Sequence, residues 1–161
     1  MKISSRLSHL LAFIALSVPM AFAGQAKTAT VARAAGQTVT LIGNDTMKYD
    51  VTIIHARPGQ ILHIVLKNVG SMPKIAMAHN VVVLKPGADG AAFTTAGMTS
   101  RQTDFIAPSL KETVLAASPF AGPGESVDLT FKVPAGRATY PFVCTFPGHY
   151  AAGMRGVIVV K

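Results

Sequence analysis

The feature that most constrains the fold is a period-two alternation of apolar and polar side chains, repeated in short runs along the chain. In residues 60–67, Leu62, Ile64 and Leu66 fall on one side of an extended backbone, and a histidine and a lysine fall on the other. Residues 126–133 repeat the pattern with four apolar side chains in alternate positions. Because successive side chains of a strand point to opposite faces, the pattern predicts β-strands with one buried face.

Turn residues separate these runs, since the 161 residues include 14 glycines and 10 prolines. We expect strands at 38–42, 49–54, 60–67, 80–85, 113–116, 126–133, 137–144 and 156–160. Residues 88–106 predict a short helix or a covering loop. About eight short strands with turns between them favour an all-β fold, an antiparallel sandwich or barrel. No internal repeat or linker divides the chain, so residues 38–161 are expected to form one domain.

The N-terminal segment has the pattern of a secretory signal peptide. Basic residues at positions 2 and 6 precede an apolar stretch, and Ala21-Phe22-Ala23 is a small-x-small cleavage site. A membrane anchor is the alternative, but the apolar stretch is short for a membrane span. We therefore expect residues 1–23 to be removed on export and residues 24–37, which lack periodicity, to be a flexible leader of the mature chain.

The charge of the chain is basic but dispersed. The formal net charge is +8, and cleavage after Ala23 would lower it to +6. The remaining basic residues are scattered singly, without a basic run or an interleaved aromatic platform. Nucleic-acid binding is therefore not expected. Apolar residues make up 50% of the chain, which excludes a disordered composition.

The chain has one cysteine, which excludes an internal disulfide and any zinc site with two thiolates. Cys144, His149 and Met154 lie within eleven residues between two expected strands, and His79 opens a much earlier strand. Two imidazoles, a thiolate and a thioether are the ligands of a blue-copper site, in which a distant axial methionine completes a trigonal plane. Alternation places Cys144 on the same face as two large apolar side chains, so both strands would direct these groups into one end of a sandwich.

Other interpretations of these residues stay open at this point. A buried free cysteine is usually a core residue. Cys144 and His149 could also form the nucleophile and base of a thiol enzyme, and zinc could occupy the same three donors. A copper carrier or storage protein would use a similar ligand set. His55 and His63 are interpreted as structural or surface residues, and the methionines at 72, 77 and 98 as packing residues.

Three segments resemble the azurin-type cupredoxins and the auracyanin-like proteins of the plastocyanin/azurin family, over residues 39–161. They are Met72-Pro73-Lys74-Ile75-Ala76-Met77-Ala78-His79-Asn80, Ala121-Gly122-Pro123-Gly124-Glu125-Ser126 and Phe142-Val143-Cys144-Thr145-Phe146-Pro147-Gly148-His149. The resemblance implies a cupredoxin-like Greek-key β-sandwich. It implies one type 1 copper, with His79, Cys144 and His149 as equatorial ligands and Met154 as axial ligand. The carbonyl of Ala78 corresponds to an opposite axial position, and Asn80 to a residue that ties the ligand loops together.

The sequence departs from azurins in three respects. Four residues instead of three separate His149 from Met154, the azurin disulfide is absent, and there is no tryptophan. The family resemblance implies a periplasmic electron carrier that is not an enzyme. Its electrons would leave through an exposed edge of His149, inside an apolar patch formed by Met77, Phe146, Pro147 and Ala151. The expected partners are redox proteins such as c-type cytochromes or copper or haem oxidoreductases, bound transiently, and a periplasmic copper carrier is the alternative function.

Overall fold

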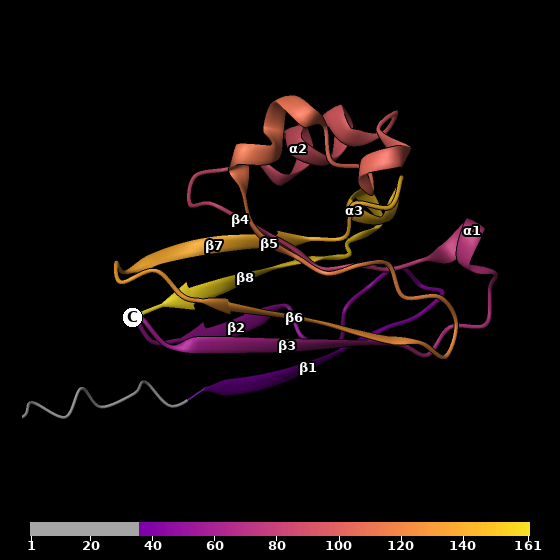
Figure 1. Ribbon diagram of the computed structural model, residues 1–161. Helices are drawn as coiled ribbons and strands as arrows, with labels where there is room; N and C mark the ends of the chain where they lie inside the picture. The colour runs from indigo at the N-terminus through magenta and orange to yellow at the C-terminus, as the bar shows by residue number, and fades with distance from the viewer. Residues whose placement is uncertain (1–35) are drawn as a thin grey trace, which may run out of the picture. The chain divides into compact units, whose positions relative to one another are not determined.

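A computed structural model describes residues 36–161, which form a two-sheet β-sandwich with eight strands (Figure 1). The smaller sheet has the order β1 (Gln37–Gly43), β3 (Ile61–Asn68), β6 (Ser126–Lys132). The larger sheet has the order β2 (Ile53–Ala56), β8 (Arg155–Val160), β7 (Ala138–Val143), β4 (Val82–Leu84), β5 (Val114–Ala117). The expected all-β sandwich is confirmed.

The core lies between the two sheets and follows the alternation in the sequence. Leu62, Ile64 and Leu66 on β3 are fully buried, whereas His63 and Lys67 on the same strand face outward. From the larger sheet, Phe142 and Ile158 enter the same cluster. Burial of one apolar face on each sheet is the main source of stability for a fold of this kind.

Short helices connect the strands: α1 (Lys74–Met77), α2 (Gly90–Gly97), α3 (His149–Ala152) and 3-10 turns at Arg101–Thr103 and Pro108–Thr113. In Figure 1, α2 lies above β4, β5 and β7, on the face of the larger sheet that is turned away from β3. Asp89 caps α2, because its carboxylate accepts hydrogen bonds from the N–H groups of Ala91 and Ala92. Phe93 then packs with Val82, Leu84 and Val143. Of the two alternatives expected for residues 88–106, a short helix or a covering loop, the helix is present.

The sequence pattern led us to expect an antiparallel sandwich, but the pairing of the strands is mixed. β1 pairs with β3 in parallel, and β2 pairs with β8 in parallel. The reason is that β2 belongs to the other sheet. The chain crosses from β1 to β2 and back to β3, so β3 runs in the same direction as β1. Periodicity along one strand carries no information about such a crossing.

Several boundaries also differ from the expected ones. The strand expected at 49–54 begins only at Ile53, because residues 49 and 50 bond to the end of β1 instead. The Asp50 N–H donates to the Ile42 carbonyl, the Asp50 carboxylate accepts from the Ile42 N–H, and Tyr49 makes an isolated bridge to Gly43. Gln37, assigned to the leader, is the first residue of β1. The expected signal peptide and most of the leader lie outside the described residues. Among residues 36–161, no helix is long and apolar enough to cross a membrane.

Candidate metal centre

Three donor side chains predicted from the sequence meet at one end of the sandwich. The Nδ1 atoms of His79 and His149 are 3.2 Å apart, and the Cys144 Sγ is 3.5 Å from the His149 Nδ1. All three donor atoms lie within 4.8 Å of one another, and each side chain is buried. These separations suit donors that share one ion at bond lengths of about 2.0–2.3 Å.

The strand pairing explains why residues so distant in sequence come together. β4 and β7 are antiparallel, with Val82 opposite Val143, so the residues just before β4 and just after β7 share one end of the sheet. His79 is fixed there by two backbone hydrogen bonds with Ala121, of 3.0 and 2.7 Å. The buried Asn68 amide also donates to the Ala121 carbonyl. His79 is therefore held by the segment around Ala121, which Asn68 at the end of β3 supports in turn.

A tight turn brings His149 back to Cys144. Gly148 has a φ of 86°, in the region where glycine is favoured, and it begins α3 directly at His149. The N–H of His149 donates to the Phe146 carbonyl at 3.1 Å. The sequence indicated the turn from Pro147-Gly148, but not the single helical turn that follows it.

Met154 is fully buried at the same end of the sandwich. Its N–H donates to the His149 carbonyl at 2.9 Å, and its carbonyl accepts from the Cys144 N–H at 3.1 Å. A Cβ added at Gly43 would come within 2.8 Å of the Met154 Cε and 3.1 Å of the His79 Cδ2. The Met154 and His79 side chains therefore both pack over Gly43. Nothing in the sequence around Gly43 signalled this contact.

The electrostatics of the three donors favour a bound cation. Burial raises the pKa of the Cys144 thiol to about 12, although the backbone N–H groups of Asn80 and Phe146 act in the opposite direction. Burial and the neighbouring His79 lower the pKa of His149 to about 4, and burial also lowers the pKa of His79. Without a metal, the group is a neutral thiol beside two neutral imidazoles.

If both Nδ1 atoms are unprotonated, their lone pairs face each other and no hydrogen bond forms between the two imidazoles. A cation among the Nδ1 atoms and the thiolate would satisfy all three donors at once. A soft thiolate with two imidazoles suits copper in both oxidation states, so these residues fit the metal that the resemblance implied.

Asn80 and Thr145 connect the two loops that carry the donors. The Thr145 N–H donates to the Asn80 Oδ1 at 2.9 Å, and the Asn80 Nδ2 donates to the Thr145 Oγ1 at 2.9 Å. The one hydroxyl proton of Thr145 is directed to the Asp104 carbonyl, at 2.7 Å. The linking role expected for Asn80 has a geometric basis in these bonds. The parts played by Thr145 and Asp104 were not predicted.

Tyr49 is a second residue that the sequence did not single out. Its ring is buried beside Phe142, and its hydroxyl donates to the backbone carbonyl of Asn80. Burial raises the pKa of Tyr49 well above its ordinary value, so the hydroxyl keeps its proton and its role as a donor. The carbonyl that it binds belongs to the residue after His79. Tyr49 thus supports the His79 segment from the core side.

Two further histidines of the described residues, His55 and His63, lie outside this group. His63 is on the outer face of β3, 3.2 Å from the Asp128 carboxylate, and His55 is on β2, so neither joins the cluster. The interpretation of Met72 and Met98 as packing residues is wrong, because they expose 42% and 52% of their surface. Both lie in surface segments outside the strands, where alternation gives no information about burial.

Comparison with known proteins agrees with this geometry. Residues 35–161 match the family of copper binding proteins described as the plastocyanin/azurin family. The chain is 36% identical to azurin of Alcaligenes faecalis over 123 residues, which is 74% of this chain and 94% of that protein. It is 33% identical to auracyanin-A of Chloroflexus aurantiacus over 118 residues, or 73% and 69% of the two chains.

A solved structure shows the same relationship in three dimensions. Dithionite-reduced auracyanin from Roseiflexus castenholzii superposes with a TM-score of 0.67 at 32% identity, over 77% of this chain and 96% of that one. The family match over residues 35–161 includes both sheets and all three donors of the cluster. The chain therefore belongs to the plastocyanin/azurin family of copper-binding proteins, as an azurin-like blue copper protein with a potential copper site at His79, Cys144 and His149.

Proposed function

We propose that the protein is a periplasmic electron carrier with one type 1 copper. The copper would be held by His79, Cys144 and His149, with the Met154 thioether as the axial ligand. The observation that supports this best is the convergence of the three donor atoms within 4.8 Å, in a fully buried setting. Copper bound there would supply a Cu(II)/Cu(I) couple, and the ligands would tune its potential.

The scaffold around the donors favours electron transfer over copper storage. Backbone hydrogen bonds fix His79 and Cys144, and the Asn80–Thr145 bonds lock their loops together. A site held in this way changes little between oxidation states, which keeps the reorganisation on electron transfer small. A carrier that delivers its metal needs ligands that an acceptor can reach, whereas these side chains are almost wholly covered.

The proposed exit for electrons is through His149. The resemblance implied an exposed edge, but His149 exposes only 2% of its surface. The Phe146 ring covers it, with centroids 4.7 Å apart. Phe146 and Pro147 are themselves partly exposed, so a single layer of side chains separates the imidazole from a docked partner. Together with Met77 and Ala151 they form an apolar surface suited to a brief, small interface with redox proteins such as c-type cytochromes or copper or haem oxidoreductases.

We also propose that the protein is not a thiol enzyme. Cys144 has no exposed surface, and the pKa of its thiol, raised to about 12 by burial, leaves almost no thiolate at neutral pH in the metal-free chain. Nucleophilic catalysis by cysteine requires the thiolate and access for a substrate. The periplasmic location rests on the signal-like pattern of residues 1–23.

The function is tested by replacing His149 with glycine in the copper-loaded protein. We expect slower electron exchange with a c-type cytochrome, measured by stopped-flow absorbance, and binding of added imidazole at the opened position. The matched control is His55→Gly, on β2 and outside the cluster. If exchange in the His149→Gly protein is as fast as in the parent, the proposed exit is wrong. If copper instead leaves readily for an apo acceptor protein, the carrier function replaces electron transfer.

A further inference from the structure

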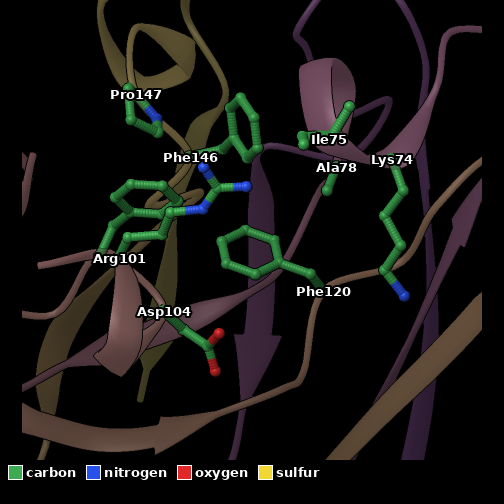
Figure 2. Close-up of a pocket in the computed structure, with 9 residues that line it drawn as sticks. Lys74, Ile75, Ala78, Arg101, Asp104, Phe120, Phe146 and Pro147 are labelled. Carbon is green, nitrogen blue, oxygen red and sulfur yellow. The ribbon is translucent and has the colours of Figure 1, made fainter.

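A pocket of about 440 Å³ opens beside the metal centre, on the Phe146 side of the cluster (Figure 2). Its size falls within the range of small-molecule sites, about 300–1,000 Å³. It is bordered by Ala78, which precedes His79, and by Phe146 and Pro147, which precede His149. A molecule in this pocket would therefore lie against both donor loops.

Three phenylalanine rings form the apolar part of the pocket. Phe105, Phe120 and Phe146 meet edge to face, with centroids 5.6 to 6.1 Å apart and interplanar angles of 64° to 90°. All three rings remain partly exposed, and Ile75 at the rim exposes 73% of its surface. Such a concave aromatic surface favours a flat aromatic ring as its occupant.

One cation at the pocket is free to bind an anion. Lys74 is already paired, because its ammonium lies 2.7 Å from the Glu125 carboxylate. Arg101 forms no salt bridge with any carboxylate in the described residues. In Figure 2 its guanidinium lies toward the phenylalanine rings, whereas the Asp104 carboxylate points away from them. A guanidinium in this position can bind a carboxylate through two parallel hydrogen bonds.

The backbone that carries Phe105 is strained. Asp104 and Phe105 have φ angles of 53° and 58°, in the left-handed region that non-glycine residues rarely adopt. Two hydrogen bonds stabilise this strained conformation. The Thr145 hydroxyl donates to the Asp104 carbonyl, and the Phe105 N–H donates to the Ser100 carbonyl at 2.9 Å. Gly97 allows the approach, since a Cβ there would lie 1.9 Å from the Phe105 oxygen.

This strained turn does two things at the pocket. It places the Phe105 ring against Phe120 and Phe146, and it leaves Arg101, three residues earlier, at the same opening. Neither arrangement is needed to hold His79, Cys144 or His149, which have their own hydrogen bonds. Backbone strain kept at a concave site is characteristic of binding sites.

We propose that this pocket binds a small planar aromatic carboxylate, with its ring against Phe105, Phe120 and Phe146 and its carboxylate on the Arg101 guanidinium. Binding does not depend on the electron-carrier function, because none of these four residues is a donor of the metal cluster. The ligand would lie one ring away from His149, since Phe146 contacts both. Its presence would therefore alter access to the apolar surface around His149.

The experiment is a titration of the Cu(I)-loaded mature chain with 2-naphthoate, followed by ¹H–¹⁵N NMR. We expect saturable shifts confined to the amides of residues around the pocket. 2-Naphthamide, which has the same ring without the charge, is expected to bind at least tenfold more weakly. Arg101→Gln is expected to weaken naphthoate binding by about the same factor, because it removes the charged partner of the carboxylate.

Two controls keep the result interpretable. Arg137→Gln removes another exposed arginine, next to β7, and is expected to leave naphthoate binding unchanged. Preserved NMR dispersion in Arg101→Gln shows that this protein is folded. The proposal is overturned if naphthoate does not saturate, if naphthamide binds equally well, or if both arginine variants weaken binding equally. The same titration of the metal-free chain separates the pocket proposal from the proposed electron-carrier function. Naphthoate binding to the metal-free chain would support the pocket even if the protein does not carry electrons with copper.

Discussion

Thr145 and Asn80, 65 residues apart in the sequence, exchange two hydrogen bonds of 2.9 Å that join the loop after β7 to the loop before β4. Each residue is the immediate neighbour of a metal donor, Cys144 in one case and His79 in the other. The Thr145 hydroxyl extends the connection to the Asp104 carbonyl. The distance between thiolate and imidazole is therefore set by polar contacts between loops as well as by the sheet.

Replacing Thr145 with valine keeps the shape of the side chain and removes the hydroxyl. The Asn80 amide and the Asp104 carbonyl would each lose a buried partner, and we expect a loss of about 1–3 kcal/mol in the free energy of unfolding. We also expect the reduction potential to move, because only the bond from the Thr145 N–H to the Asn80 Oδ1 would still join the two loops that carry His79 and Cys144. Denaturant unfolding and voltammetry of the copper-loaded protein measure the two effects. Thr139→Val, on the exposed face of β7, is the control and is expected to change neither.

Replacing Tyr49 with phenylalanine removes the hydroxyl that donates to the Asn80 carbonyl. The carbonyl lies in the core, so the loss of its donor is expected to lower the free energy of unfolding by about 1–3 kcal/mol. We expect a shift in the visible absorption of the copper form as well, because Asn80 follows His79 directly. The control is Tyr140→Phe, a buried ring whose hydroxyl makes no hydrogen bond within residues 36–161. Equal effects of the two substitutions would contradict a specific role for Tyr49.

Gly43→Ala tests the packing of Met154 against His79. The added Cβ would lie 2.8 Å from the Met154 Cε, so the thioether must shift, and the His79 ring at 3.1 Å limits where it can go. Overpacking of this kind costs about 1–3 kcal/mol. We expect the electron paramagnetic resonance spectrum of the Cu(II) form of Gly43→Ala to differ from that of the parent. The control is Gly36→Ala, whose added Cβ has no neighbour closer than 3.7 Å, and its spectrum is expected to match the parent's. If the spectrum of Gly43→Ala is the same as that of the parent, Met154 does not lie near the copper.

The metal-free protein should lose stability in mild acid. Burial lowers the folded-state pKa of His149 to about 4, while an unfolded histidine titrates near 6.5. Between these values the unfolded chain binds the extra proton, so the free energy of unfolding falls as pH is lowered from about 6.5 to 4. Urea unfolding at several pH values across this range measures the slope of the free energy of unfolding against pH. The parent and His149→Gln are compared without metal, and an equal slope in both would contradict the assignment to His149.

The sequence predicted those parts of the structure that depend on local pattern. Alternation in residues 60–67 correctly identified the buried side of β3, and the short spacing from Cys144 through His149 to Met154 predicted that these residues lie together. Parallel pairing of β1 with β3 could not be predicted, because it depends on β2 crossing to the other sheet. Tyr49 and Gly43 were missed for a related reason. Their roles arise from contacts with residues that are distant in the chain, and neither residue type is unusual in a strand or loop.

An absorption titration detects a redox-active copper held by Cys144 together with two histidines. The mature protein, purified without metal, is titrated with Cu(II) and then treated with ascorbate. We predict an intense visible thiolate-to-copper band that saturates at one copper per chain, bleaches on reduction and is absent from Cys144→Ser. A sample that stays colourless, or one whose band persists in Cys144→Ser, would rule out a blue copper site at Cys144.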